Sequence, residues 1–255
     1  MRLLYTISLV LAFVLSSGCS SENGNDLAEP SAVTLLTRAE TATPVAHRLL
    51  VFGEVGNDAC LLNHSFVSGD ALKLDDGSYR FVTLTATGSF DLPAAGVIDG
   101  VSLDRLLPLK ENTTLQPVMI SAVTKVETPD ETTYIANLHP ATCLLKLELK
   151  NAPADLTLEL QNMAAGLSLS GSYSGAGKAY PLKKEEDNLC LPTVGNAIIQ
   201  YTSEGKTQTI EFGMPLESGY TYSARLQWNK EEDSFKVLSK VEMWLGDSNT
   251  NGEAD

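Results

Sequence analysis

The segment Tyr220–Asn229 alternates apolar and polar side chains over its whole length. The apolar set occupies every second position and comprises Tyr220, Tyr222, Ala224, Leu226 and Trp228. A period of two puts all of these side chains on one face of a β-strand. The polar insert Lys230–Ser234 then reverses the chain, and apolar residues resume at alternate positions from Phe235. Because an amphipathic hairpin is not stable alone in water, this pattern requires a second sheet to cover its apolar face.

Shorter β-prone runs recur along the chain and are separated by turn residues. Such runs, about five to eight residues long, predict β-sandwiches. Consecutive apolar residues at Leu49–Phe52 predict a central strand that is buried on both faces. Val101–Leu107 does not alternate and predicts one or two helical turns, whereas Gly166–Gly177 is rich in Gly and Ser and predicts a loop. The remaining expected strands are Ala32–Arg38, His47–Val55, Tyr79–Ala86, Gln116–Glu127, Thr132–Leu138, Thr142–Lys150, Leu156–Met163, Leu189–Leu191, Ala197–Thr202 and Thr207–Phe212.

The β pattern falls into two halves that meet at His139-Pro140. Proline cannot donate a hydrogen bond to a β-ladder and restricts the residue before it, so this dipeptide is a plausible junction. We therefore expect one β-sandwich over residues 32–138 and a second over 139–255, the last ten residues being a disordered tail. Residues 20–31 are small, polar and acidic, which predicts a flexible tether.

Residues 1–19 have the features of an export signal. Arg2 supplies a positive charge, and Leu3–Leu15 is an apolar stretch too short to span a membrane. Small residues then precede Cys19, as in a bacterial lipobox, although the usual Leu stands one position early. We therefore expect the Cys19 thiol to carry lipid. Two or more acyl chains at this end would anchor the protein stably to a membrane. The alternative is an ordinary cleaved secretory leader with an incidental cysteine.

The charge of the chain excludes some partners. It carries 18 Lys and Arg against 32 Asp and Glu, a net charge of −14. Nucleic-acid binding needs a basic surface, and so does a helix held to anionic lipid by its charges. We expect neither, and the acidity fits an exposed protein that must stay soluble.

Three cysteines follow Cys19. An exported chain meets an oxidising compartment, so Cys60, Cys143 and Cys190 predict one disulfide and one free thiol. Cys143 lies on the apolar face of its expected strand, and Cys190 opens the next one, which favours a Cys143–Cys190 pair. Buried unpaired thiols are the alternative. No Cys-x-x-Cys motif occurs and the three histidines stand apart, so we expect no metal site.

The sequence contains no motif that points to catalysis. It has neither a nucleophile elbow nor a phosphate-binding loop, and nothing groups its Ser, His and Asp residues. We therefore expect no enzyme and no cofactor. Tyr173, Tyr180 and Trp244 could stack on sugars, but aromatic residues at strand positions are more often part of the core.

Several pieces of the chain, taken in order, resemble the fimbrillin family, the lipoprotein-derived subunits of type V pili of Gram-negative anaerobes. They cover most of the mature chain. The matching pieces are the lipobox at Cys19, the acidic tether, Thr34–Ala39 ahead of the strand at Arg48–Val55, Asp76–Val82, Leu145–Asn151, Asp155–Gly171, Gly219–Tyr222 and Val241–Trp244 with the polar tail after it.

The resemblance implies two tandem transthyretin-like β-sandwiches behind a lipoprotein signal peptide. It also implies assembly by strand exchange, in which a trypsin-like protease cuts after an arginine behind the first strand. The strand then leaves, and a strand of a neighbouring subunit fills the groove. Arg38 matches the scissile residue, and the alternative is an ordinary loop arginine on an uncut subunit. The removable strand would be Ala32, Val33, Thr34, Leu35, Leu36 and Thr37.

These inferences together predict an outer-membrane lipoprotein at the cell surface. It would be a structural or accessory subunit of a fimbrium, would partner other pilus subunits, and could adhere to a host or bacterial surface ligand. The tail after Trp244 is short and polar, so a donor strand would have to come from Phe235–Leu245. That departure from the family leaves room for an anchor or tip role. The alternative function is a glycan-binding surface lipoprotein.

Overall fold

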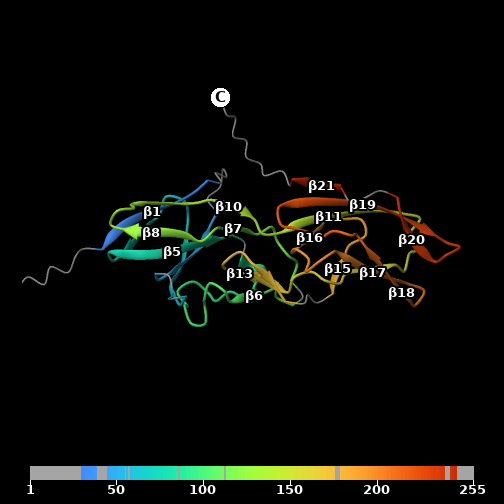
Figure 1. Cartoon of the computed structure of the whole chain (residues 1–255), viewed down its shortest axis with the longest axis horizontal. Coiled ribbons are helices and arrows are strands. Elements are labelled where there is room, and N and C mark those ends of the chain that lie inside the picture. The colour runs from blue at the N-terminus through green and yellow to red at the C-terminus, as the bar shows by residue number, and fades with distance from the viewer. Residues whose placement is uncertain are drawn as a thin grey trace, which may run out of the picture.

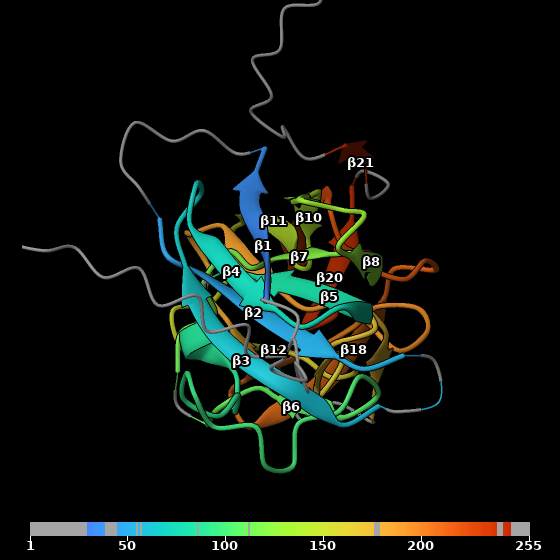
Figure 2. The ribbon, with the colours of Figure 1, turned by 90° about the vertical axis from the view of Figure 1, so that its left-hand side faces the viewer.

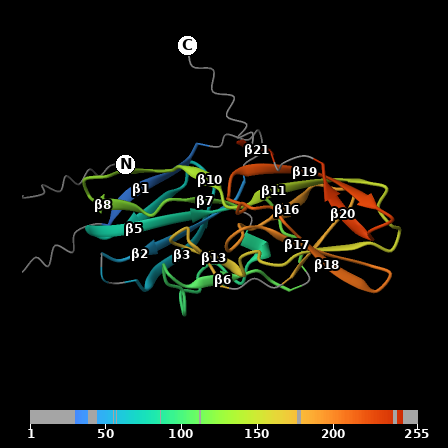
Figure 3. The ribbon, with the colours of Figure 1, turned by 45° about the vertical axis from the view of Figure 1, so that its right-hand side comes forward.

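The structure is a computed structural model that describes residues 30–38, 45–54, 56, 58–85, 87–111, 113–175, 179–238 and 242–245. These residues form 21 strands and one short 3-10 helix, η1 (Thr87–Ser89), which confirms the expected all-β class. The strands make five sheets. Figures 1 and 3 show the sheets of the first half and those of the second half following one another along the long axis.

The first β-sandwich pairs a three-stranded sheet with a six-stranded sheet. The smaller sheet has the order β4-β1-β9, with β1 spanning Ser31–Thr37, β4 Ala71–Leu74 and β9 Thr133–Ala136. Figure 2 views it from the end at which β1 and β4 lie. The larger sheet has the order β10-β7-β5-β2-β3, with β8 also on β5, and comprises β2 (His47–Phe52), β3 (Cys60–Phe66), β5 (Gly77–Leu84), β7 (Met119–Ser121), β8 (Thr124–Thr128) and β10 (Leu138–Pro140).

Strand β2 is buried on both faces, as its unbroken apolar run predicts. Leu49 and Val51 pack with Val33 and Leu35 in the core between the two sheets of the first sandwich. The alternate side chains of β2 point to the opposite face, where they join a larger core that continues into the second half of the chain. Because successive side chains of a strand point to opposite faces, one strand can serve two cores.

The second β-sandwich contains a five-stranded and a four-stranded sheet. In the first of these, β11 and β19 run parallel over seven register pairs from Leu144↔Thr221 to Lys150↔Gln227. The alternation from Tyr220 is confirmed, since Tyr222, Ala224, Leu226 and Trp228 are all buried. The strands are β11 (Cys143–Lys150), β16 (Asn188–Cys190), β19 (Tyr220–Asn229), β20 (Ser234–Val237) and β21 (Glu242–Leu245), facing β12 (Thr157–Leu160), β15 (Tyr180–Leu182), β17 (Ile198–Ser203) and β18 (Lys206–Glu211).

A fifth sheet joins the two halves. It has the order β14-β13-β6, so that β6 (Leu106–Pro108) of the first half pairs with β13 (Gly166–Ser168) of the second, and β14 (Tyr173–Ser174) completes it. Two expectations are therefore wrong. The Gly/Ser-rich segment contains strands, and Val101–Leu107 is not helical, because Leu103 accepts a hydrogen bond from the Ser170 amide and β6 joins the sheet.

The expected junction at His139-Pro140 falls inside β10, which pairs with β7 of the first sandwich. Pro140 is tolerated there because β10 lies at the edge of its sheet. Only Ala141 and Thr142 separate β10 from β11, and both are buried. The chain therefore passes from one half to the other without an exposed linker.

Candidate functional site

Strand β1 is the middle strand of its sheet, so both of its edges are bonded. It pairs antiparallel with β4 from Ser31↔Leu74 to Thr34↔Ala71, and parallel with β9 from Thr34↔Thr133 to Thr37↔Ala136. Leu35 adds two hydrogen bonds at the β4 side, from its amide to the Asp70 carbonyl and from the Gly69 amide to its own carbonyl, both 2.8 Å long. The six residues Ala32–Thr37 are thus an integral part of the first sandwich.

The inner face of β1 fills the core of the first sandwich. Val33 and Leu35 are fully buried, and Thr37 is nearly so, whereas Ala32 on the outer face is exposed. Complete burial of a Val or Leu side chain stabilises a fold by about 1.5–3 kcal/mol. Loss of β1 would leave β4 and β9 with unpaired backbone groups on either side of an apolar groove, which Phe81 of the opposing sheet and Tyr134 of β9 line.

The floor of this groove contains a buried polar cluster. The Tyr134 hydroxyl lies 3.2 Å from Thr83 Oγ1 and 3.3 Å from Ser121 Oγ, and Ser121 Oγ accepts the Thr83 amide. Burial raises the pKa of Tyr134, and these two hydrogen bonds oppose that shift in part. The Tyr134 ring meets Phe81 edge to face, 4.9 Å between centroids. The cluster fixes the floor in one arrangement.

His47 lies at the start of β2, with its ring 5.5 Å from that of Phe66. The side chain is 6% exposed, and Nδ1 has no hydrogen-bond partner among the described residues. Burial lowers the pKa of this imidazole, because a charged ring would lose its solvation there. His47 is therefore neutral in the folded protein at neutral pH.

The predicted maturation residue, Arg38, directly follows β1 and is exposed. Cleavage after Arg38 stays a prediction, because residues 39–44 lie outside the described part of the chain. The predicted lipid attachment residue, Cys19, lies outside the described residues.

The structure brings the predicted disulfide partners together without a bond between them. Cys143 and Cys190 are register partners on β11 and β16, yet all three described cysteines are free and buried. Each thiol donates to a main-chain carbonyl instead, Cys143 to Cys190 at 3.5 Å and Cys190 to Asn188 at 3.6 Å. Burial raises the pKa of Cys143 to about 12 and that of Cys190 well above its usual value, so neither readily forms the thiolate that disulfide chemistry needs.

The C-terminal strands are paired within the chain. β20 and β21 pair antiparallel with successive parts of β19, from Asn229↔Ser234 to Leu226↔Val237 and from Ser223↔Glu242 to Tyr220↔Leu245. The described strands of Phe235–Leu245, the segment expected to supply a donor strand, are thus paired with β19 of the same chain.

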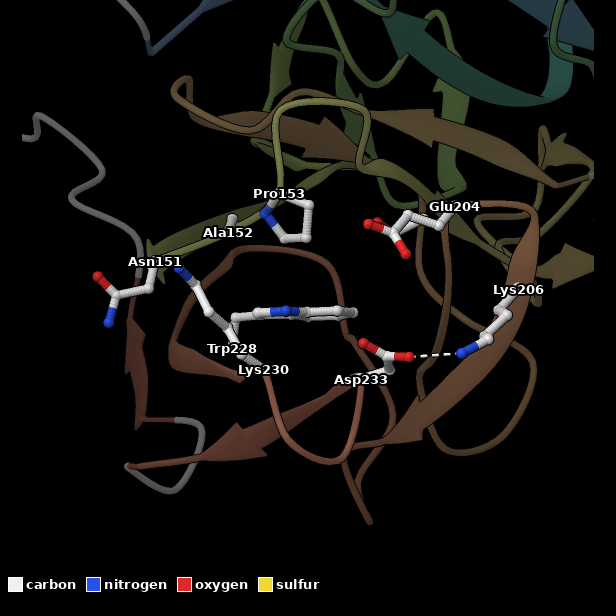
Figure 4. A pocket seen from close by; sticks show the side chains of 9 residues that line it. Asn151, Ala152, Pro153, Glu204, Lys206, Trp228, Lys230 and Asp233 are labelled. Atoms are coloured by element: carbon white, nitrogen blue, oxygen red, sulfur yellow. Dashed lines mark hydrogen bonds and ion pairs between the residues drawn. The ribbon is translucent and has the colours of Figure 1, made fainter.

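A hollow of about 790 Å³ lies at the end of the second sandwich that is remote from β1. Three turns meet there: the one after β11, the β17–β18 turn and the β19–β20 turn. Figure 4 shows the Trp228 ring edge-on at its centre, with Pro153 above the ring and Asp233 below it. The lining residues are Asn151, Ala152, Pro153, Ser203, Glu204, Lys206, Trp228, Lys230 and Asp233.

Hydrogen bonds fasten the three turns to one another. Asp155 accepts from Ser203 Oγ at 2.9 Å and from the Glu204 amide at 2.6 Å, and these bonds lower the pKa of its carboxyl group. The Lys206 ammonium group binds the Asp233 carboxylate at 2.5 Å. Gln208 donates to the Asp233 carbonyl at 2.8 Å. These bonds hold the three turns in one arrangement around the hollow.

The sequence did not predict this hollow, because its residues are ordinary turn and strand residues from three distant segments. The aromatic residues singled out for sugars lie elsewhere. Tyr173 and Tyr180 pack against the core, and the Tyr173 hydroxyl donates to the Ala141 carbonyl at 2.9 Å. The side chain of Trp244 lies outside what the structure describes.

Within the described residues, no group of three or more His, Cys, Asp or Glu side chains is placed to hold a metal ion. No helix in the same part of the chain is long and apolar enough to cross a membrane.

Solved structures of the same fold cover nearly the whole of this chain. A candidate adhesin from Bacteroides ovatus has a TM-score of 0.59 at 13% identity, over 86% of this chain and 96% of its own. A candidate polysaccharide-binding protein from Bacteroides thetaiotaomicron has a TM-score of 0.58 at 14% identity, over 84% and 98%. The fimbrial anchor protein Mfa2 from Porphyromonas gingivalis has a TM-score of 0.57 at 11% identity, over 85% and 98%.

No family model matches the sequence, and no curated protein sequence does. The similarity therefore lies in the fold, and the three proteins named are adhesion, binding and fimbrial proteins rather than enzymes. These structural neighbours agree with the fimbrillin resemblance of the sequence. The chain has the tandem β-sandwich fold of adhesins and fimbrial proteins from Bacteroides and Porphyromonas.

Proposed function

We propose that this protein is a cell-surface fimbrial subunit, or a pilus-associated adhesin, that is exported as a lipoprotein and associates with other subunits by strand exchange. One observation carries the proposal: β1 is the middle strand between β4 and β9, and an exposed arginine follows it. The fimbrial anchor and the adhesin of the same fold support a role at the cell surface.

The groove under β1 suits a replacement strand. A strand entering between β4 and β9 would restore both ladders, and main-chain hydrogen bonds would supply affinity without a demand on sequence. Specificity would come from two or three apolar side chains, placed two residues apart to match Val33, Leu35 and Thr37.

The engagement of β20 and β21 favours a terminal position in the fibre over a position in its stalk. A stalk subunit must both accept a strand and donate one, whereas this chain pairs its last strands with its own β19. An anchor that keeps its lipid on Cys19, or a tip subunit, needs only one of these two connections.

Mass spectrometry of the protein from its own cells tests the proposal. A chain that begins at Ala39 in the pilus fraction would support exchange of β1, and the Arg38→Ala variant should then keep β1 and be lost from that fraction. Lys110→Ala, which removes an exposed basic residue elsewhere, is the control. If every chain begins at an acylated Cys19, this protein does not accept a strand at β1 and only an anchor role is left. Absence from pili altogether would overturn the fimbrial proposal.

A further inference from the structure

The hollow around Trp228 has a feature that no other part of the described chain shares. Asn151, Glu204 and Asp233 have φ angles of 56°, 49° and 48°, and they are the only described non-glycine residues with positive φ. All three line the hollow. Positive φ is the conformation that tight hairpin turns such as Glu204-Gly205 require, so these residues fix the geometry of the turns that meet at the hollow.

The chemistry of the lining favours a neutral polar ligand. Its four charged side chains are two lysines, Lys206 and Lys230, and two acids, Glu204 and Asp233, so their formal charges cancel. The lining therefore gives neither an anion nor a cation a net charge to bind, and the net charge of −14 on the chain repels anions further. Ammonium groups donate hydrogen bonds, carboxylates accept them, and the Asn151 amide does both.

The apolar part of the lining is small and rigid. Trp228 is 8% exposed and lines the hollow beside Pro153. The Trp228 ring is held from behind by Phe235, 5.0 Å between centroids, and by Tyr201 at 6.1 Å. A narrow apolar surface among convergent donors and acceptors suits a ligand that has both C–H faces and many hydroxyl groups.

From these observations we infer that the hollow is a binding site for a neutral carbohydrate chain. This inference rests on the adhesion role proposed above, and it names the class of ligand to which the protein would adhere. Its volume of about 790 Å³ falls within the range of small-molecule sites, about 300–1,000 Å³. The hollow and β1 lie at opposite ends of the molecule, so attachment through the N-terminal side leaves the hollow free to meet a ligand (Figure 1).

The test uses the exported chain, from residue 20 onward and without lipid, on an array of maltohexaose, cellohexaose, xylohexaose, mannohexaose, neutral host oligosaccharides and sialylated ones. We expect retention of at least one neutral oligosaccharide. The double variant Asn151→Gly, Glu204→Gly should weaken that binding about tenfold or more by loss of two polar contacts. Glycine accepts positive φ, so this variant removes the side chains without adding backbone strain.

Asp99→Gly is the matched control, because it removes one carboxylate from an exposed turn in the first half of the chain and does not line the hollow. It should bind as the wild type does, and equal melting temperatures of the three proteins show that all are folded. Retention of no neutral oligosaccharide, retention of sialylated ones alone, or equal binding by the double variant would each overturn the inference. The pilus fraction of cells that express the double variant separates the two proposals. A variant that loses carbohydrate binding but is still recovered in pili leaves the fimbrial proposal intact, and that proposal fails only if the wild type is absent from pili.

Discussion

Gly166 of β13 packs directly on Leu107 of β6, across the seam between the two halves of the chain. A Cβ atom at Gly166 would overlap the Leu107 carbonyl and would lie 2.9 Å from Pro108 Cα. The two residues belong to strands that are register neighbours, Gly166↔Pro108 and Leu167↔Leu107. A glycine is therefore required at this position by the close approach of two backbones.

Gly166→Ala should lower the free energy of unfolding by about 3 kcal/mol, because backbone atoms cannot move aside as a flexible side chain can. Gly88→Ala is the control, since a Cβ there meets nothing within 4 Å, and it should change stability by less than about 0.5 kcal/mol. Urea unfolding followed by tryptophan fluorescence measures both. Equal stability of the two variants would mean that the backbones of β6 and β13 do not approach closely enough to require a glycine at position 166.

A disulfide that ties β1 to β4 should block strand exchange. Ala32 and Lys73 are register partners with exposed side chains, so cysteines at both positions are suitably placed to form a bond. The Ala32→Cys, Lys73→Cys variant should be exported and folded but should not accept a strand, and a reductant should restore exchange. Recovery of pilus subunits by gel electrophoresis without heating measures the outcome, with Ala32→Cys alone as the control. Normal assembly of the oxidised double variant would exclude exchange of β1.

His47 should make the protein less stable in weak acid. Its pKa is lowered in the folded state from the usual 6.5, so the unfolded chain binds a proton that the folded chain does not. Stability then falls as the pH drops through about 6.5 toward the folded-state pKa, and the contribution levels off below it. His47→Leu should flatten this dependence between pH 7 and 5, whereas His139→Gln, at an exposed position, should not. Urea midpoints measured across that range would contradict the prediction if His47→Leu keeps the wild-type slope.

The three buried thiols should resist modification in the folded protein. Burial raises the pKa values of Cys60, Cys143 and Cys190, and this leaves little thiolate at neutral pH. A thiol reagent such as DTNB, applied to the chain from residue 20 onward, should titrate few thiols in native buffer and three in guanidinium chloride. A count of one under denaturing conditions would instead reveal the Cys143–Cys190 disulfide.

Periodicity predicted the strands that obey it. The alternation through Tyr222 and Trp228 gave a strand with the correct buried face, and the apolar run Leu49–Phe52 gave a doubly buried one. Strands β3 and β4 were not predicted. β3 mixes apolar residues with the polar residues Asn63 and His64. Asn63 can be buried because its side-chain amide donates hydrogen bonds to the carbonyls of Ala94 and Val97. Such burial depends on tertiary partners, which a local pattern does not contain.

The same dependence on tertiary contacts explains why the sequence indicated β1 but not the hollow around Trp228. Residues Ala32–Thr37 could be identified because a β-prone run and its following arginine are contiguous in sequence. The hollow could not, because Asn151, Glu204 and Asp233 come together only when three turns meet at one end of a sandwich. Asp233 is of a residue type that adopts positive φ readily and Glu204 precedes a glycine, but such turn signals are common along the chain and do not show which turns meet.

A protein attached to a surface bears tension whenever the cell is pulled away from what it holds. In this chain two connections run in parallel between the halves, the covalent step from Pro140 to Cys143 and the β6–β13 ladder. Neither has slack, and both are embedded in the common core. A load applied near β1 would therefore pass through both connections at once, because the buried residues Ala141 and Thr142 leave no exposed linker there that could extend first.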